Sequence, residues 1–237
     1  MPIVWQLDIV GPVYRGCYVL GFLTIFIFNT FYGKQYGIKP QKALPFTVLS
    51  YIVIFAWSFV LAWIANGFEW GHHNAIRVYI WFPLVLFVFG KLFGVRLRDA
   101  MDYMAPSTCI VYAIARMGCT LTGCCNGIPF RFGIYSCMVE ERCFPVQLCE
   151  TITAALIAWY IIKYVKAHGP FQGGMLYANM LIVYGYSRFF WEFLADNEKV
   201  FLGISELAVH AFVCGTVGVM MYFFLKAYNK KQSVVKA

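Results

Sequence analysis

Charged residues are scarce in this sequence. Asp, Glu, Lys and Arg make up 13% of its 237 residues, whereas soluble domains average roughly 25%. Acidic residues number only 11, and hydrophobic residues reach 61% of the chain. So few charges cannot form the polar surface that a soluble domain of this length needs. The composition therefore predicts an integral membrane protein.

The sequence also lacks the usual marks of several domains or of secretion. No Gly/Ser-rich linker, internal repeat or low-complexity tract interrupts it, so we expect a single domain over residues 1–237. The first residues, Met1–Trp5, lack the basic stretch with which a cleavable signal peptide begins. We therefore expect no such peptide.

The net charge of +8 would fit a nucleic-acid-binding protein if the basic residues were clustered on one element. Instead they fall in short connections between apolar runs, which is the pattern of a membrane protein's cytoplasmic face. We therefore expect membrane lipids as partners and no nucleic acid.

Seven apolar segments each approach the ~20 residues that a membrane-spanning helix needs. They predict an all-α, polytopic membrane protein with about seven transmembrane helices. The fourth segment is the weakest, since it contains Asp102 and Pro106, but the crossings on either side require it. The segments are Tyr14–Phe31, Leu44–Trp63, Val78–Phe93, Met101–Met117, Val146–Ile162, Met175–Leu194 and Leu207–Leu225.

Lysines and arginines alternate between the two sides of this arrangement. The connections after the first, third and fifth segments and the C-terminus are rich in them, whereas the other side has few basic residues and several acidic ones. The positive-inside rule therefore predicts an N-terminus outside and a C-terminus in the cytoplasm. The basic side contains Lys34, Lys39, Lys42, Lys91, Arg96, Arg98, Lys163, Lys166, Lys226, Lys230, Lys231 and Lys236, and the other side contains Arg131, Arg142 and Lys199.

The sixth segment contains an arginine and a glutamate four residues apart. Charges at membrane depth are costly, so they are usually paired or functional. Tyr184, Arg188 and Glu192 share one helix face, because four residues make about one turn. The pair could be a structural link between helices. Alternatively, Arg188 binds an anion while Glu192 orients it or handles a proton, which we favour because buried ion pairs rarely add net stability.

A second arginine, Arg116, ends the fourth segment and is followed by a turn rich in glycine and cysteine. It could be an arginine that extends to the membrane surface. A phosphate-binding role is favoured by its planar guanidinium and by Gly118, Gly123 and Gly127, whose backbone N–H groups could approach an anion closely. Together with Arg188, it suggests an anionic ligand, most simply a lipid phosphate.

Other polar residues are weaker candidates. Tyr14 and Tyr184 could donate hydrogen bonds to a lipid headgroup, or could be interfacial aromatic residues. Gln147 and Glu150 lie in the first turn of the fifth segment, where capping of the helix is the favoured role for Glu150. Gln147 is a candidate substrate contact. His73 and its neighbour are adjacent in sequence and share no helix face, so they give little support to a metal site.

Nine cysteines are present, and five of them lie in the connection between the fourth and fifth segments. The spacing C-x4-C-C is not one of the common zinc patterns, so we predict no metal. The five are Cys119, Cys124, Cys125, Cys137 and Cys143.

Five stretches together resemble the prolipoprotein diacylglyceryl transferase family of bacterial membranes. The family's Asp-x-x-Ala-Pro is matched by Asp102–Pro106, and its Gly-Arg-x-Gly-Asn-Phe-x-Asn-x-Glu-x-x-Gly signature aligns with Ala115–Gly127. Its Pro-x-Gln-Leu-Tyr-Glu aligns with Pro145–Glu150, and its Tyr-Gly-x-x-Arg-x-x-x-Glu with Tyr184–Glu192. Near the start, Tyr14–Phe22 is similar to the family's first helix.

The sequence departs from the family at several polar positions. In the signature, Ala115, Cys119, Thr122 and Cys124 replace Gly, Asn, Asn and Glu. The family's His-Gly-Gly before the third helix has no counterpart, and His73 lies nearest to its expected place. These differences are typical of a divergent, cysteine-rich branch.

The resemblance implies transfer of the diacylglyceryl group of phosphatidylglycerol to a lipobox cysteine of a prolipoprotein, with release of glycerol phosphate, in the bacterial plasma membrane. It implies no metal or organic cofactor. Arg116 and Arg188 would bind the phosphate, Glu192 would orient groups or transfer a proton, and Tyr14 and Tyr184 would bind the headgroup. Further substrate contacts would be Gly118, Gly127, Gln147 and His73. The base stays open among His73, Tyr14 and Glu192.

Three alternatives remain. The missing histidine fits a non-catalytic or altered-substrate lipid-binding member of the family. Cys119, Cys124 and Cys125 fit a thiol-redox or metal-handling membrane protein. A transporter is less favoured, because no broken helices or inverted repeat are evident.

Overall fold

The computed structural model describes residues 7–65, 76–136, 138–201 and 203–236. Within these ranges the chain is mostly helical, with two short antiparallel sheets, β1–β2 and β3–β4. The helices are α1 (Leu7–Tyr32), α2 (Pro40–Ala65), α3 (Ile76–Phe93), α4 (Leu97–Thr122), α5 (Val146–His168), α6 (Met175–Glu192) and α7 (Glu206–Lys236), with a 3-10 turn η1 (Gly33–Tyr36). The strands are β1 (Pro129–Ser136), β2 (Glu141–Cys143), β3 (Lys199–Phe201) and β4 (Ile204–Ser205).

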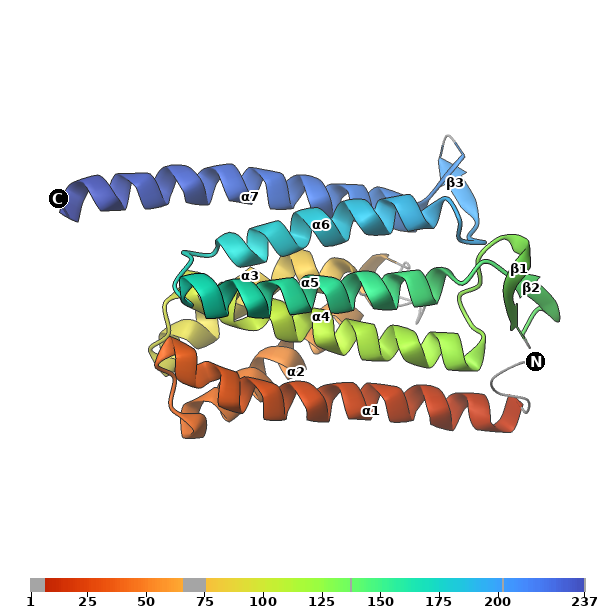
Figure 1. The fold of residues 1–237 in the computed structure, drawn as a ribbon, viewed down its shortest axis with the longest axis horizontal. Helices are drawn as coiled ribbons and strands as arrows, with labels where there is room; N and C mark the ends of the chain where they lie inside the picture. The colour runs from red at the N-terminus through yellow and green to blue at the C-terminus, as the bar shows by residue number, and fades with distance from the viewer. Residues whose placement is uncertain (1–6, 66–75, 137, 202, 237) are drawn as a thin grey trace.

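The helices lie side by side as a bundle (Figure 1). Each of the predicted apolar segments lies on one of them, so the prediction of a mostly helical chain is confirmed, whereas the two short sheets were not predicted. Helix α4 continues to Thr122 rather than ending at Met117. The turn that the sequence seemed to begin at Gly118 is therefore helical in its first half, because Gly123, with φ of +70°, ends the helix five residues later.

Four stretches are long and apolar enough to cross a membrane, namely residues 11–36, 40–64, 146–168 and 206–232. Helices α3 and α4 meet this standard together, across a short break where they bend by 119°, which raises the number to five. The described part of the chain thus has four to five candidate spans by length and composition. The count of seven and the orientation stay predictions.

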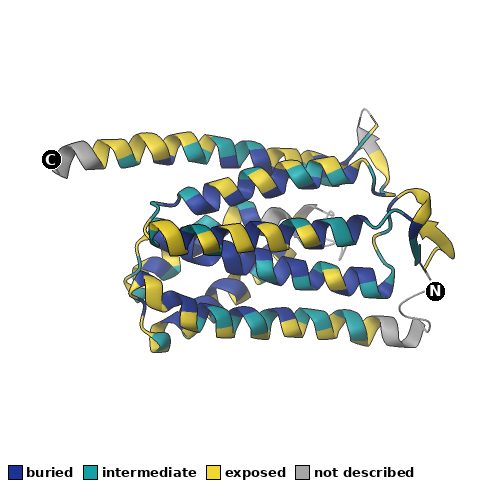
Figure 2. Ribbon diagram, in the orientation of Figure 1, coloured by how far each residue is buried: buried dark blue, intermediate teal, exposed yellow. Residues whose placement is uncertain are grey.

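The outward faces of the bundle are apolar. Exposed residues follow the outer sides of α1, α5 and α7 (Figure 2), and many are large hydrophobic side chains such as Leu23, Trp159 and Phe224. In water this surface would be unfavourable, whereas lipid tails would cover it at no cost. The exposure pattern therefore supports a membrane location.

The two ends of the bundle differ in charge. The C-terminus and the connections after α1, α3 and α5 lie at one end, and the sheets and the start of α1 lie at the other (Figure 1). The lysines and arginines that the sequence placed on one side therefore gather at one end. We call this end the basic end and the opposite one the sheet end.

Polar contacts near the basic end join several helices. The amide of Asn29 on α1 donates to Ser107 Oγ on α4 at 3.1 Å and to Thr47 Oγ1 on α2 at 3.3 Å. Tyr103 on α4 donates to the Asn29 carbonyl at 2.9 Å. Each group is buried, so the hydrogen bonds satisfy polar atoms that would otherwise be costly. They fix α1 and α2 against α4.

Asp102 explains why an acidic residue interrupts the fourth apolar segment. Its carboxylate accepts hydrogen bonds from the backbone N–H groups of Gly174 (2.8 Å) and Leu176 (2.9 Å), at the start of α6. The first N–H groups of a helix lack intrahelical partners, and an anion there is favoured by the helix dipole. Asp102 thus fastens α4 to the beginning of α6.

Helices α6 and α7 pack through glycine. A Cβ atom at Gly185 would lie 2.3 Å from the backbone nitrogen of Gly215, which leaves no room for a side chain. Gly218 is similarly close to Ile182. Small residues let membrane helices approach in this way. The contact sets the rotation of α6, which directs Arg188 toward the interior.

Candidate functional site

Glu150 joins the two arginines that the sequence singled out. Its Oε2 pairs with Nε of Arg116, and its Oε1 lies 2.8 Å from Nη1 of Arg188. The Glu150 side chain is 3% exposed, Arg188 4% and Arg116 17%. Two guanidinium groups from α4 and α6 therefore meet at one buried carboxylate from α5.

Arg188 also pairs with Glu192 one turn later on α6. Glu192 is 1% exposed, and its other oxygen accepts hydrogen bonds from Asn197 and, at 3.0 Å, from Ser205. The predicted shared face of Arg188 and Glu192 is present. Nη1 of Arg188 is within ion-pair distance of both carboxylates, those of Glu150 and Glu192.

Tyr112 completes the connection between the arginines. Its hydroxyl donates to Glu150 Oε2 at 2.7 Å and accepts from Arg116 Nε at 3.0 Å. Tyr112 lies one turn before Arg116 on α4, so a regular helix places both at the same carboxylate. The sequence gave no separate indication of this residue among the 16 tyrosines.

The four charges are close to electrical balance, with two guanidinium and two carboxylate groups. Breaking a buried pair by removing one partner costs about 3–5 kcal/mol, so the arrangement is stable only as a whole. Such a network in a low-dielectric interior can stabilise charge that develops on a bound anion.

An apolar groove adjoins this network. It has a volume of about 420 Å³ and passes between α1, α2, α3 and α4. Tyr112, at the inner end of the network, is also part of the groove wall. The groove is lined by Tyr18, Tyr51, Phe55, Val78, Tyr79, Thr108, Val111, Tyr112 and Ala115.

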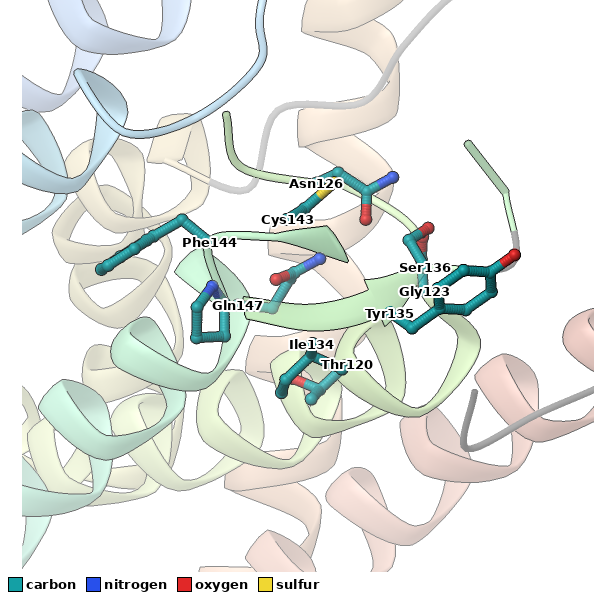
Figure 3. A pocket seen from close by; sticks show the side chains of 10 residues that line it. Thr120, Gly123, Asn126, Ile134, Tyr135, Ser136, Cys143, Phe144 and Gln147 are labelled. Carbon is teal, nitrogen blue, oxygen red and sulfur yellow. The ribbon is translucent and has the colours of Figure 1, made fainter. Parts of the chain in front are cut away.

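A second, smaller pocket of about 250 Å³ lies under the β1–β2 hairpin (Figure 3). The Gln147 side chain enters it from the first turn of α5, and its amide donates to the backbone carbonyl of Cys124. Ser136 on β1 donates to the carbonyl of Gly123 at 2.8 Å. These bonds hold the hairpin and α5 against the end of α4.

Three thiols meet at that end of α4. The Sγ atoms of Cys119, Cys124 and Cys125 all lie within 4.8 Å of one another. We call this group the cysteine cluster. Nη1 of Arg116 lies 3.8 Å from Cys119 Sγ. Hydrogen bonds from the thiols of Cys119 and Cys124, helped by the Arg116 guanidinium, lower the pKa of Cys125 below its ordinary value, which favours a thiolate there.

Comparison with known proteins identifies the family of the chain. The family model for prolipoprotein diacylglyceryl transferase matches residues 78–227, which include Arg116, Glu150, Arg188 and the cysteine cluster. The chain belongs to the prolipoprotein diacylglyceryl transferase family. The resemblance inferred from the motifs is thus confirmed.

Two relatives from clostridia have low sequence identity to the chain. The chain is 25% identical to a phosphatidylglycerol–prolipoprotein diacylglyceryl transferase of Clostridium tetani over 120 residues, 48% of this chain and 47% of the relative. It is 21% identical to phosphatidylglycerol–prolipoprotein diacylglyceryl transferase 2 of Clostridium perfringens over 145 residues, 57% of this chain and 55% of the relative. The matches thus span about half the length of each relative.

The two predicted tyrosines lie on α1 and α6. Tyr14 is half-buried on α1, its hydroxyl is 3.1 Å from that of Tyr18, and its ring lies beside Gly118 of α4. Tyr184 is 3% exposed, with its ring 5.1 Å from that of Tyr112 between centroids. Its hydroxyl has no hydrogen-bond partner among the described residues. Such burial does not fit the interfacial alternative for Tyr184, and a headgroup role stays a prediction.

The glycines serve packing rather than an open anion-binding turn. Gly118 is inside α4, where a Cβ atom would lie 2.8 Å from Cβ of Cys17 on α1. At Gly127 it would lie 2.4 Å from the carbonyl oxygen of Phe144. The expectation that their backbone N–H groups surround an anion was wrong for Gly118, whose N–H belongs to a helix, and we assign no phosphate contact to either.

Two further outcomes concern Glu150 and His73. The capping role favoured for Glu150 was wrong, since its carboxylate binds Tyr112 and the arginines of two other helices. Sequence spacing could not indicate this, because the partners are 34 and 38 residues away and meet only in the folded bundle. His73 lies outside the described residues.

Replacing Tyr112 with phenylalanine should lower about tenfold the rate of the lipid transfer that the family resemblance implies. The ring would still line the groove, but Glu150 would lose a hydrogen-bond donor, and a bond to a charged group contributes roughly 1.5–3 kcal/mol. Initial rates at saturating lipid would measure the effect. Tyr160→Phe, on the exposed face of α5, is the matched control and should transfer at the normal rate. A Tyr112→Phe variant as active as the wild type would contradict the role.

Proposed function

We propose that the protein transfers the diacylglyceryl group of phosphatidylglycerol to the thiol of a lipobox cysteine in a prolipoprotein. The single observation that carries this is the meeting of Arg116 and Arg188 at Glu150, beside an apolar groove, in a chain of this family. The names of the clostridial relatives agree with it.

In the reaction, the thiolate sulfur of the acceptor attacks the glycerol carbon that bears the phosphate. A C–S bond forms, the C–O bond breaks, and glycerol phosphate leaves with the electron pair. Negative charge grows on the leaving phosphate, so preorganised guanidinium groups lower the barrier. Arg116 and Arg188 take this role. Tyr14 and Tyr184 bind the headgroup.

Glu192 orients Arg188 or accepts a proton, and Glu150 holds the two arginines at one point. An incoming phosphate must replace part of the ion pairing that Glu150 provides to Arg116 and Arg188. Gln147, predicted as a substrate contact, donates to the Cys124 carbonyl, and we propose that it acts by holding this turn.

The apolar groove receives part of an acyl chain. Its wall contains aromatic and aliphatic side chains from four helices, and its inner end reaches Tyr112. A lipid whose tail occupies the groove would therefore have its headgroup at the arginines. Seven crossings of a bacterial plasma membrane, with the sheet end outside, would place this site toward the outer leaflet, where lipobox cysteines arrive.

The test is incubation of purified protein with phosphatidylglycerol and a lipobox peptide, followed by mass measurement of the peptide. We expect a peptide heavier by one diacylglyceryl group, and no change in a peptide whose cysteine is replaced by serine. If well-folded protein leaves both peptides unmodified but still binds the phospholipid, the alternative of a non-catalytic lipid-binding member would be correct instead.

A further inference from the structure

The cysteine cluster has the composition and spacing of a metal site. Cys119, in the last turn of α4, is buried, Cys124 is half-buried and Cys125 is exposed. Thiolates prefer soft or borderline cations such as zinc. Ligands at Zn–S distances of ~2.3 Å in a tetrahedron are about 3.8 Å apart. Sulfur atoms already within 4.8 Å therefore need only side-chain rotations to share one ion.

The backbone conformation that brings these thiols together is strained. Cys125 has φ of +58°, a left-handed conformation that residues with a side chain rarely adopt. Such strain persists only where the surroundings impose it, and it is concentrated at functional sites. Here the Gln147 amide holds the Cys124 carbonyl, and the left-handed Gly123 ends α4 just before it. The turn is thus built to bring three sulfur atoms to one point.

We propose that Cys119, Cys124 and Cys125 bind one thiophilic divalent cation of the zinc class, whose fourth coordination position takes the acceptor cysteine of the substrate as a thiolate. The second half of this proposal rests on the proposed lipid transfer. Three protein ligands with one open position are the arrangement of zinc sites that act on a substrate.

This site would activate the acceptor thiol, which the arginine network does not do. Transfer to sulfur needs a thiolate, and a thiol that coordinates zinc gives up its proton, here to water. The bound sulfur then attacks carbon as described above, and the metal keeps its charge throughout. The sequence has no counterpart of the family's histidine, so activation of the thiol by a metal would replace a base.

The position and charge of the cluster fit this role. Three thiolates and a divalent cation carry a net charge of −1, and a fourth thiolate makes it −2. The Arg116 guanidinium, 3.8 Å from Cys119 Sγ, offsets part of this charge. Because Arg116 also pairs with Glu150, an acceptor sulfur on the metal would lie next to the proposed phosphate site. Cys125 is exposed, which leaves a path for the acceptor.

The first experiment measures binding without activity. Purified, reduced full-length protein would be titrated with Co²⁺, and the sulfur-to-cobalt charge-transfer absorption in the near ultraviolet recorded. We expect saturation at one ion per chain, competition by Zn²⁺, and loss of the signal in Cys119→Ala, Cys124→Ala and Cys125→Ala. Cys214→Ala removes a buried thiol of α7 outside the cluster and should bind normally. The absence of a saturable signal would overturn the site. An unchanged signal in a variant in which Cys119, Cys124 and Cys125 are all replaced by alanine would also overturn it.

The second experiment tests the open position. Adding a lipobox peptide to the cobalt-loaded protein should increase the charge-transfer absorption, because a fourth sulfur joins the ion, and the serine peptide should leave it unchanged. Equal spectra with both peptides would overturn the acceptor role.

Transfer assays then separate this inference from the proposed function. We expect a chelator to abolish transfer and Zn²⁺ to restore it. Full transfer by metal-free protein would refute thiol activation while the proposed function stands. Conversely, a cobalt spectrum that responds to the cysteine peptide in a protein without transfer would support the metal site and refute the proposed function. Arg188→Ala should keep the spectrum and lose transfer, because Arg188 does not contact the cluster in this proposal.

Discussion

Replacing Arg188 with alanine should reduce diacylglyceryl transfer by a factor on the order of 10³ or more, while the protein still inserts into the membrane. One preorganised donor to a developing anion contributes about 10²–10³ in rate, and Arg188 also keeps Glu150 and Glu192 in place through its two ion pairs. Transfer to a lipobox peptide, normalised to the amount of membrane-inserted protein, measures the effect.

Two matched variants separate catalysis from stability. Arg188→Lys keeps the positive charge but not the planar fork, so we expect a loss of roughly 10- to 100-fold. Arg96→Ala removes an arginine that is 70% exposed at the other end of the bundle, where it pairs with Asp99, and should be fully active. An inserted Arg188→Ala protein with normal transfer would show that the arginine is structural only.

Glu150→Gln should destabilise the protein by about 3–5 kcal/mol, because two buried guanidinium groups would lose their shared counter-ion. For a chain of this length that corresponds to a fall in Tm on the order of 10 °C. The side-chain volume hardly changes, so lost packing does not explain such a fall. Thermal unfolding in detergent measures it, and Glu141→Gln, on the exposed β2 strand, is the control.

Glycerol phosphate should partly restore the stability of Glu150→Gln. Its phosphate would occupy the position that the carboxylate left, so the rise in Tm should be larger than for the wild type, where Glu150 competes. Sulfate at equal ionic strength separates this effect from screening. If glycerol phosphate shifts both proteins equally, the arginines do not form a phosphate site.

The fold was largely predictable because its determinants are local. Apolar runs of nearly 20 residues indicate membrane helices without knowledge of their neighbours. The prediction errors arose where contacts between residues far apart in the sequence determine the structure. Asp102 made the fourth segment look weak, yet it is needed there to bind the first N–H groups of α6. The end of α4 was misplaced because Gly118, which could equally begin a turn, instead packs against Cys17.

The site was predictable for the residues whose chemistry is unusual in a membrane. Arg188 and Glu192 stand out because charged side chains at membrane depth are costly unless they are paired or functional. Glu150 did not, because an acidic residue near a helix start has an ordinary explanation. Tyr112 was hidden among many tyrosines, and the cysteine cluster had no recognisable spacing, since one of its thiols is on a helix and two are on the turn that follows it.

The distribution of hydrogen bonds along α4 has a consequence for how a lipid enters. Between the described residues of α1 and α4, the side-chain hydrogen bonds gather around Asn29, near the basic end. Toward the sheet end the same two helices pack through Gly118 and Cys17, where a Cβ atom on the glycine would lie 2.8 Å from Cβ of Cys17. We therefore expect any separation of α1 from α4 to begin at this end, while the half around Asn29 stays fixed. Such an opening would face the bilayer sideways, so that the phospholipid of the proposed reaction could enter with its tails still in the membrane.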